Sequence, residues 1–307
     1  MTTTEDSAQP TREGVAYIGG QIVPIAQAAI PILDLGFLHS DANYDVVHVW
    51  NRRFFRLDDH LDRFEQGMAK LRMSLPFDRV RIRQILHECV RASGLDRAYV
   101  ELICTRGMAA PGSRDPRDCE NQFYAFVVPF AWVATQEQRE RGLAVHVSSV
   151  QRISPDSVDP TVKNYHWLDL VQGLYDAYDH GAETALLSDA AGNVVEGPGF
   201  NVFAVTRHAL VTPKVGVLRG VTRKTALEIG AELGEELGLR VEERALPYAE
   251  LVDAREVFVT STAGGVMPVT TIDGRPVGAG VPGPVTREIR SRYWASHDDS
   301  RFFEAVY

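Results

Sequence analysis

A lysine and a glutamate 33 positions apart, followed by two runs of small and hydroxyl residues, offer the clearest chemistry in this sequence. Glu196, in V-V-E-G-P-G-F, follows Lys163 at 196 − 163 = 33 positions. A lysine amine can hold a carbonyl cofactor as a Schiff base, and an ionised carboxylate keeps a pyridine nitrogen protonated so that the ring accepts electrons. The runs G-V-T-R-K and S-T-A-G-G offer N–H groups and hydroxyls to a phosphate. These features together predict a pyridoxal phosphate site.

Each of these residues also has an ordinary structural interpretation. The chain contains four lysines, and a lysine chosen at random would usually be a solvated surface charge. Glu196 could be a turn carboxylate, although a lone acid among apolar residues is unlike a solvated charge run. Arg63 could be a helix-surface arginine that pairs with Asp59 at i−4. The hydroxyl residues of the two runs could be plain cap or strand-end residues.

The order of several longer segments resembles the class IV (fold-type IV) aminotransferases, and among them the (R)-selective amine transaminases look closest. The resemblance extends from about residue 14 to the C-terminus, and the loop at 108 to 120 matches least. The segments that carry it are G-F-L-H-S-D-x-x-Y-D at 36 to 45, F-F-R-L-D-D-H-L-D-R at 54 to 63, Y-V-E-L-I-C-T-R-G at 99 to 107 and D-P-T-V-K-N-Y-H-W at 159 to 167. In one departure, Pro198 stands two residues after the glutamate, where many members carry a smaller residue.

The resemblance assigns roles to the residues that would hold the cofactor. It implies a Schiff base on Lys163 and a contact between Glu196 and the pyridine nitrogen. A long helix is expected to begin immediately after Gly220, so that its first N–H groups point at a phosphate. The phosphate would be held by Arg63, Val221, Thr222, Ser261 and Thr262.

The substrate pocket is expected beside a strand at about 98 to 106. Alternation along that strand places Tyr99 and Glu101 on one face, and Val100, Leu102 and Cys104 on the other, which we interpret as core. In the resemblance the first face lines the pocket. A carboxylate there would repel a substrate carboxylate and favour a neutral amine.

Further pocket residues are expected from loops and a strand. His39 and Tyr44 match pocket positions of the amine transaminases, although a backbone-bonded loop histidine and a plain strand tyrosine remain open. The keto acid needs a carboxylate binder, for which an arginine fork is suited. Arg114 and Arg117 in G-S-R-D-P-R-D-C are the candidates, and an ordinary surface loop is the alternative.

The implied activity is transfer of an amino group from a primary amine to a keto acid such as pyruvate, with Lys163 as general base and acid. The resemblance implies selectivity for (R)-amines or D-amino acids, because fold-type IV proteins present the opposite cofactor face to most aminotransferases. The alternatives are a D-amino acid transaminase, a branched-chain aminotransferase, an aminodeoxychorismate lyase-like enzyme, or a protein that binds the cofactor without catalysis.

Composition bounds the remaining possibilities. With 307 residues, 45% hydrophobic and 24% charged, the chain can form two domains with proper cores. Its net charge of −9 argues against nucleic acid or an anionic membrane as a partner, and its longest apolar run is too short to span a bilayer. Three scattered cysteines without metal-ligand spacing indicate reduced thiols and a cytoplasmic location. The resemblance implies a homodimer.

The predicted elements form a mixed α/β, two-domain fold of the D-amino acid and branched-chain aminotransferase type. Hairpins are expected to turn at Gly19-Gly20 and near Asn51-Arg52, followed by a helix capped by Asp58 or Asp59, a helix at about 78 to 92, and strands at about 98 to 106 and 121 to 131. A helix at 165 to 180 should follow the lysine. The expected division is a disordered extension at 1–12, a smaller domain at 13–134, a connection at 135–141 and a larger cofactor-binding domain at 142–307.

Overall fold

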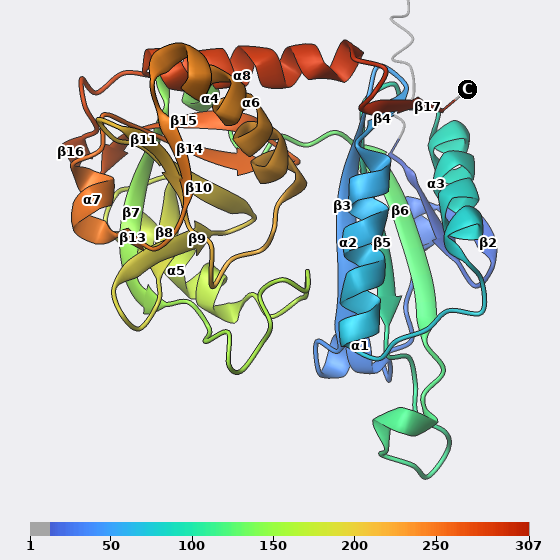
Figure 1. Cartoon of the computed structure of the whole chain (residues 1–307). Helices are drawn as coiled ribbons and strands as arrows, with labels where there is room; N and C mark the ends of the chain where they lie inside the picture. The colour runs from blue at the N-terminus through green and yellow to red at the C-terminus, as the bar shows by residue number, and fades with distance from the viewer. Residues whose placement is uncertain (1–12, 307) are drawn as a thin grey trace, which may run out of the picture.

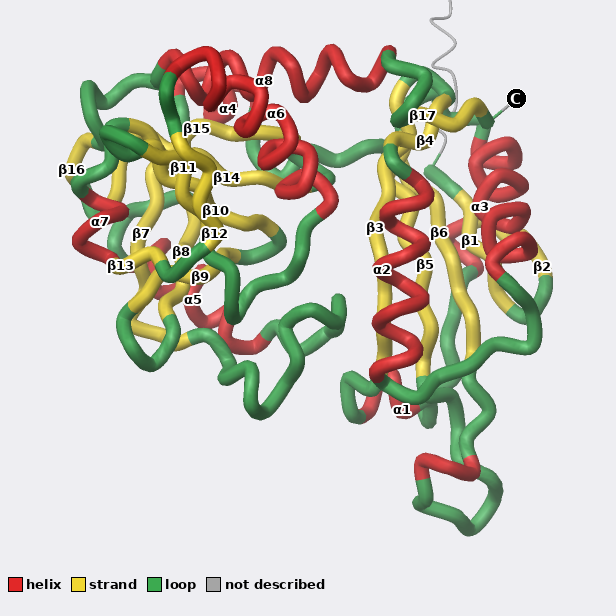
Figure 2. The backbone as a smooth tube through the Cα atoms, in the orientation of Figure 1, coloured by secondary structure: helices red, strands yellow, loops and turns green. Residues whose placement is uncertain are grey.

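The computed structural model describes residues 13–306, which form two β-sheets that lie side by side and are flanked by helices (Figure 1). The mixed α/β class expected from the sequence is confirmed. The expected disordered extension, residues 1–12, lies outside the described residues. Figure 2 shows that long loops join the strands of both sheets at the lower edge of this view.

The first sheet has seven antiparallel strands in the order β17-β4-β3-β5-β6-β1-β2. Both hairpins expected from the sequence are present, at Gly19-Gly20 and at Asn51-Arg52. The strands are β1 (Val15–Ile18), β2 (Gln21–Pro24), β3 (Ala42–Trp50), β4 (Arg53–Phe55), β5 (Ala98–Thr105), β6 (Gln122–Pro129) and β17 (Phe303–Ala305).

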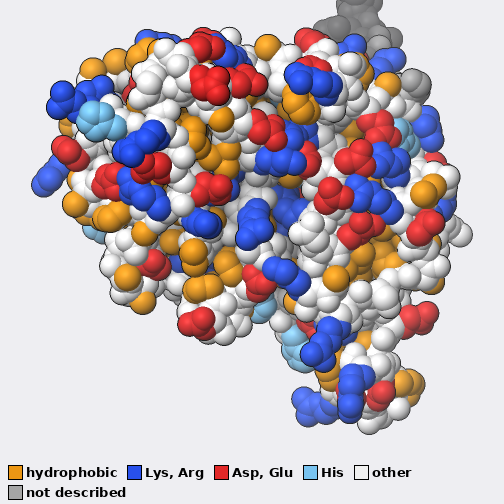
Figure 3. Space-filling model, viewed as in Figure 1, with side chains coloured by type: hydrophobic (Ala, Val, Ile, Leu, Met, Phe, Trp, Pro, Cys, Tyr) orange, Lys and Arg blue, Asp and Glu red, His pale blue; other side chains and the backbone are white. Residues whose placement is uncertain are grey.

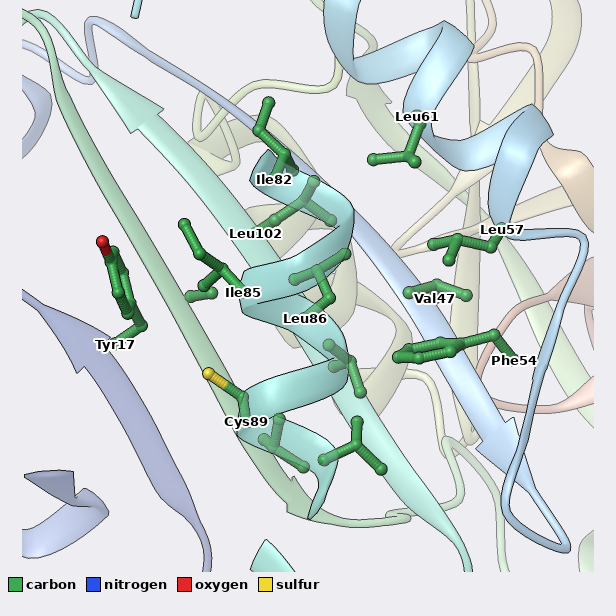
Figure 4. Close-up of a cluster of buried hydrophobic side chains, with 14 of the residues drawn as sticks. Tyr17, Val47, Phe54, Leu57, Leu61, Ile82, Ile85, Leu86, Cys89 and Leu102 are labelled. Carbon is green, nitrogen blue, oxygen red and sulfur yellow. The ribbon is translucent and has the colours of Figure 1, made fainter. Parts of the chain in front are cut away.

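Helices α2 (Leu57–Lys70) and α3 (Arg79–Ser93) cover one face of this sheet. Figure 4 shows the apolar side chains that pack between these helices and the sheet. Val100, Leu102 and Cys104 are fully buried there, as the strand alternation predicted. Alternation also divides β3, because Val47 and Val49 face this core while Tyr44 and Val46 face away from it, toward the second sheet.

The start of α2 differs from the expectation. Arg56, in the left-handed region at φ 52°, is the N-cap, and no side chain caps the helix. Asp58 and Asp59 lie in the first turn, where carboxylates interact favourably with the helix dipole without acting as caps. The helix expected at about 78 to 92 is confirmed, with the side chain of Asp78 as its cap.

The second sheet has ten strands, in the order β12-β11-β10-β14-β15-β7-β8-β9-β13, with β16 beside β15. An additional pairing of β9 with β10 closes six of these strands into a ring. The strands are β7 (Leu143–Gln151), β8 (Thr184–Ser188), β9 (Asn193–Gly197), β10 (Phe200–Val205), β11 (Ala209–Thr212), β12 (Arg240–Glu243), β13 (Leu246–Pro247), β14 (Glu256–Ser261), β15 (Gly265–Ile272) and β16 (Arg275–Pro276).

Helices around the second sheet include the long helix expected after Gly220. The lysine loop is followed by a helix three residues later than expected, at 168 instead of 165. Among residues 13–306, no helix combines the length and the apolar character needed to cross a membrane. The remaining helices are α1 (Leu35–Leu38), α4 (Gln136–Arg141), α5 (Leu168–Asp179), α6 (Val221–Leu237), α7 (Tyr248–Val252) and α8 (Pro284–Ala295), with 3-10 turns at Ile25–Gln27, Pro116–Asp118 and Ser296–Asp298.

The division at 13–134, 135–141 and 142–307 remains a proposal, with two structural amendments. The connection contains a short helix, α4, which begins with a capping box at Thr135. Helix α8 runs from the second sheet to the edge of the first (Figure 1), where β17 pairs with β4. The last strand of the chain thus belongs to the first sheet.

Candidate active site

A cavity of about 520 Å³ lies between the two sheets, and Figure 3 shows a hollow with basic side chains around it on this face of the molecule. The first sheet and α2 contribute Tyr44, Val46, Tyr99 and Arg63 to its wall. The second half contributes the lysine loop, the end of β9, the start of α6 and the turn after β14. The cavity therefore depends on segments that are far apart in the sequence.

Lys163 lies in the loop before α5, and β3 fixes its position. The backbone N–H of Tyr44 donates to the carbonyl of Lys163 at 2.9 Å, and Asn43 and Asn164 form an antiparallel bridge. The Lys163 ammonium lies 4.3 Å from the centre of the Tyr44 ring, a cation–π contact. The lysine is thus held at the junction of the two halves, inside the cavity wall.

Glu196 is a buried carboxylate in β9 that also lines the cavity. The Leu218 N–H donates to its Oε2 at 3.0 Å, and Arg152 Nε donates to its Oε1 at 3.1 Å. Burial raises the pKa of Glu196, and the positive charge of Arg152 opposes that increase. Arg152 in turn binds Asp169 at 2.6 Å.

Arg152 is a residue of the candidate site that sequence reasoning missed. It follows the last residue of β7 and lies 44 positions before Glu196, so no local pattern joins the two. The only sequence signal for Arg152 was its position, one residue after the end of a strand that leads toward the lysine loop.

The start of α6 and the turn after β14 face each other across one end of the cavity. Gly220 is the N-cap of α6 without a side-chain cap, which leaves N–H groups at Val221 and Thr222 available. Ser261 and Thr262 line the same cavity. Thr260 lines it too, and its buried hydroxyl finds no hydrogen-bond partner within residues 13–306.

Arg63 pairs with a different carboxylate from the one suggested by helix spacing. Its Nε and Nη2 bind Asp45 at 2.7 and 2.8 Å, while Asp59 pairs with Arg56 and Lys224. Arg63 Nη1 donates to the carbonyl of Arg219 at 3.1 Å, which places the guanidinium beside the start of α6.

Asp45 is fully buried. Burial alone would raise its pKa, but the charge of Arg63 and the hydrogen bonds from His60 and Arg63 outweigh burial and hold the pKa well below its ordinary value.

Tyr44 and Tyr99 form the cavity wall on the side of the first sheet. Tyr44 stacks on Tyr165 of the lysine loop, with ring centres 4.2 Å apart and planes 4° apart. Glu101 accepts from the Tyr165 hydroxyl at 2.6 Å and from the Tyr99 hydroxyl at 3.2 Å. Burial raises the pKa of Glu101, and these hydrogen bonds and the charge of Lys163 oppose the increase.

The predicted pocket residue Glu101 lies behind two tyrosines in this structure and stays a prediction as a substrate-binding residue. Its carboxylate is covered by the hydroxyls of two tyrosines and is absent from the residues of the cavity wall. The hydroxyls of Tyr99 and Tyr165 donate hydrogen bonds to the Glu101 carboxylate, and these bonds orient the two rings.

Three predicted substrate-binding residues do not reach the cavity of their own chain. His39 is exposed at the end of α1. Arg114 and Arg117 lie on the loop at 106–121, which projects away from both sheets (Figures 1 and 2). The Arg117 side chain is 87% exposed and pairs with Asp115. These two arginines therefore lie outside the cavity formed by the same chain, and their binding of a keto-acid carboxylate stays a prediction.

Comparisons with known proteins agree on one family. The family model described as Amino-transferase class IV matches residues 42–272. The D-alanine aminotransferase of Bacillus licheniformis is 30% identical over 275 residues, 89% of this chain and 93% of that protein. The branched-chain-amino-acid aminotransferase of Pseudomonas aeruginosa is 28% identical over 291 residues, 92% of each protein.

A solved structure of the branched-chain amino acid aminotransferase of Thermobaculum terrenum, in its PLP form, has a TM-score of 0.85 and 26% sequence identity to this chain, covering 97% of this chain and 100% of that one. The chain belongs to the class IV aminotransferases, which use pyridoxal phosphate. It is accordingly a pyridoxal phosphate-dependent aminotransferase.

The residues around the cavity fit this cofactor. An uncapped helix start and the unpartnered hydroxyl of Thr260 suit a phosphate, a buried carboxylate suits a pyridine nitrogen, and a lysine suits an aldehyde. The cavity of about 520 Å³ also leaves room for a substrate.

Proposed function

We propose that the protein is an (R)-selective amine transaminase, which transfers the amino group of a primary amine to a keto acid such as pyruvate. The observation that supports this proposal is the engagement of the two arginines in the cavity wall. Arg63 is bound by Asp45, and Arg152 is bound by Glu196 and Asp169. A donor carboxylate would have to compete with these carboxylates, whereas an uncharged donor substituent would lie on the rings of Tyr44 and Tyr99. The carboxylate of the keto acid is proposed to be bound instead by Arg114 or Arg117 of a second chain.

The residues of the site are proposed to act as follows. Bound pyridoxal phosphate supplies an aldehyde that exchanges an amino group and a ring that accepts electrons. Lys163 holds the cofactor covalently between turnovers and, when released, takes the proton from the donor carbon. Glu196 holds a proton at the pyridine nitrogen, and Arg152 keeps that carboxylate ionised. Arg63, Val221, Thr222, Ser261 and Thr262 bind the phosphate.

The tyrosine wall is proposed to bind the substituents of the amine. Tyr44 and Tyr99 contribute ring surface that excludes water, and Glu101 holds Tyr99 and Tyr165 by their hydroxyls. These rings are rigid because Tyr44 is stacked and the other two are hydrogen-bonded. A rigid wall discriminates between the two enantiomers of an amine, since exchanging the large and small substituents makes one of them collide.

A homodimer is proposed because large apolar side chains are exposed around α1 and at the start of α5. Ile32, just before α1, and Phe37, within it, are 73% and 62% exposed, and Leu168 at the start of α5 is 78% exposed. A second copy that covers α1 would bring His39 and the loop with Arg114 and Arg117 close to another chain. A measured mass of two chains that Phe37→Glu reduces to one would support this assembly.

A cytoplasmic location is also proposed. Cys89 and Cys104 are free and buried, and burial raises the pKa of each thiol to about 12, which makes them inert. Free thiols without a disulfide are usual in reducing compartments.

The deciding experiment compares amine donors in the holoenzyme. Acetophenone release is measured from (R)- and (S)-1-phenylethylamine with pyruvate as acceptor, and Lys163→Ala serves as the inactive control. Ketone from the (R)-amine alone, lost in the control, is the expected result. D-Alanine and L-leucine with 2-oxoglutarate are run in parallel.

Three other outcomes would replace the proposal. Activity with D-alanine but neither amine would indicate a D-amino acid transaminase, in line with the Bacillus licheniformis relative. Activity with L-leucine would indicate a branched-chain aminotransferase, in line with the Pseudomonas aeruginosa relative. Pyruvate release from aminodeoxychorismate, supplied without an amino acceptor, would indicate an aminodeoxychorismate lyase-like enzyme.

A further inference from the structure

A second group of ligating side chains lies outside the cavity, where the end of α5 meets β7. It consists of His146 in β7, Asp176 in the last turn of α5 and His180, the C-cap of that helix. One ligand atom from each residue lies within 4.8 Å of the others. None of the three lines the cavity, so the group is separate from the cofactor site.

Asp176 is held in place by the polar groups of β7. Its Oδ2 accepts from the Ser148 hydroxyl at 2.5 Å and from the Ser149 N–H at 2.9 Å. Its carboxylate is therefore already ordered before a metal ion binds.

His146 has the geometry of a metal-binding histidine with a supporting carboxylate. Its Nδ1 lies 2.6 Å from Oδ1 of Asp273 and carries the proton, because a carboxylate only accepts. Asp273 is itself held by the Val147 N–H at 2.9 Å and the Tyr248 hydroxyl at 2.8 Å. The other ring nitrogen of His146, Nε2, lies 3.7 Å from Asp176 Oδ2 and is on the side of the ring that faces the group.

His180 completes the group from one turn along α5. Its Nδ1 donates to the carbonyl of Asp176 at 2.8 Å, which leaves Nε2 as the acceptor nitrogen. Its ring stacks on that of His146 with centres 4.2 Å apart, and its side chain is 58% exposed. The ring can therefore turn toward the other two ligands at little cost, and water can reach the open side.

We propose that His146, Asp176 and His180 bind a divalent transition-metal ion, with zinc as the best match. Two imidazoles and one carboxylate suit zinc, with water in a fourth position. Tetrahedral zinc needs ligand atoms roughly 3.4 Å apart, so the three side chains would draw closer than their present limit of 4.8 Å when the ion binds. The ion joins the last turn of α5 to β7, and through Asp273 to the turn between β15 and β16.

The expected role of the ion is to stabilise α5. Leu170, Leu174 and Tyr178 of this helix line the cavity, while the ligands lie off the cavity wall. Zinc should raise the melting temperature, by about 3 °C at a concentration well above the dissociation constant, because it binds the folded chain only.

The test is a zinc titration of the untagged, EDTA-dialysed holoenzyme by isothermal calorimetry, repeated with His180→Ala, Asp176→Asn and His208→Ala. His208 is an exposed histidine in the turn between β10 and β11 and serves as the matched control. We expect one ion per chain in the wild type and in His208→Ala, and affinity at least about tenfold weaker in the other two variants. Zinc that binds at the cofactor would bind all four proteins equally.

The outcomes separate clearly. Equal zinc affinity in His180→Ala and the wild type would overturn the proposal, as would the absence of binding to the wild type. Because His180 is exposed at a helix end, its alanine variant should fold, and an unchanged melting temperature in EDTA would confirm that. The proposal would be supported if the zinc-induced rise in melting temperature is lost in His180→Ala and Asp176→Asn alone.

Discussion

At the scale of single residues, Arg152 is the largest of the influences that oppose the effect of burial on the pKa of Glu196. A buried carboxylate prefers to be neutral, and burial does raise the pKa of Glu196. The Arg152 guanidinium at 3.1 Å and the Leu218 N–H at 3.0 Å favour the anion. Asp169 orients Arg152 at 2.6 Å from the other side. The proposed role of Glu196 at the pyridine nitrogen thus depends on a residue that does not itself need to touch the cofactor.

Arg152→Gln should shift the acid limb of the pH–activity profile. Without the guanidinium, the pKa of Glu196 rises further, so the carboxylate is protonated up to a higher pH and the acid limb moves upward. We expect kcat to fall at least about tenfold near neutral pH, which corresponds to ~1.4 kcal/mol. Arg152→Lys should recover part of the activity, because it retains the charge.

The control is Arg207→Gln, a change of the same type at an exposed arginine in the turn after β10. It should leave the profile unchanged. A profile of Arg152→Gln that coincides with the wild type would show that Glu196 is ionised without the help of Arg152.

At the scale of elements, the loop between β11 and α6 presents the start of α6 to the cavity. Gly220 has an ordinary φ of −62°, so its restriction is steric. A Cβ there would lie 2.3 Å from Oδ1 of Asn201. Asn201 Nδ2 donates to the carbonyl of Leu218 at 2.9 Å and fixes this loop. Close approach of the helix start to β10 therefore requires glycine at 220.

Gly220→Ala should weaken cofactor binding, because the added methyl group displaces Asn201 and moves the start of α6. Overpacking of this kind costs roughly 1–3 kcal/mol. The dissociation constant for pyridoxal phosphate, from an absorbance titration of the apoenzyme, should therefore rise about fivefold or more.

A double-mutant cycle isolates the contact. On the background of Asn201→Ala, which removes the colliding atom, Gly220→Ala should add little further loss. Full additivity of the two changes would contradict the steric explanation.

At the scale of the whole molecule, buried histidines join the two halves. His48 in β3 and His297 after α8 lie with their Nε2 atoms 2.8 Å apart, and His297 stacks on Phe55 of β4. Burial lowers the pKa of His48, and it lowers the pKa of His297 from 6.5 to about 4. Burial also lowers the pKa of His60 in α2. All three are therefore neutral in the folded protein.

Stability should fall as the pH drops from about 6.5 toward 4. The unfolded chain binds protons at these histidines before the folded one does, so the free energy of unfolding rises with pH across this window and levels off above it. For His297 alone the change is about 3 kcal/mol, at 1.36 kcal/mol for each pKa unit. Melting temperatures measured from about pH 7 to about pH 4.5 should show the decrease.

His297→Gln should make that decrease shallower, because the variant has one titrating group fewer. The exposed His208 provides the comparison, since His208→Gln should leave the slope as in the wild type. An equal slope in His297→Gln and the wild type would show that His297 does not contribute.

The sequence by itself determined the local elements and the residues whose chemistry is unusual. Both hairpins, α3, α6 and the alternation of β5 follow from turn residues, caps and periodicity, which act over a few neighbouring positions. The start of α2 was less well determined, because its N-cap is Arg56 rather than an aspartate. Lys163 and Glu196 were recognisable because few residues of their kind lie in such apolar or small-residue surroundings.

Only the tertiary structure decided which residues meet at the cavity. Arg152 meets Glu196, Arg63 meets Asp45 and Glu101 meets Tyr165, and each pair is brought together by the packing of elements within one half or between the two halves. Spacing along the chain cannot report such contacts, because their partners lie 18 to 64 positions apart. The same packing leaves His39, Arg114 and Arg117 outside the cavity of their own chain, because His39 lies at the exposed end of α1 and the loop at 106–121 projects away from both sheets (Figure 1).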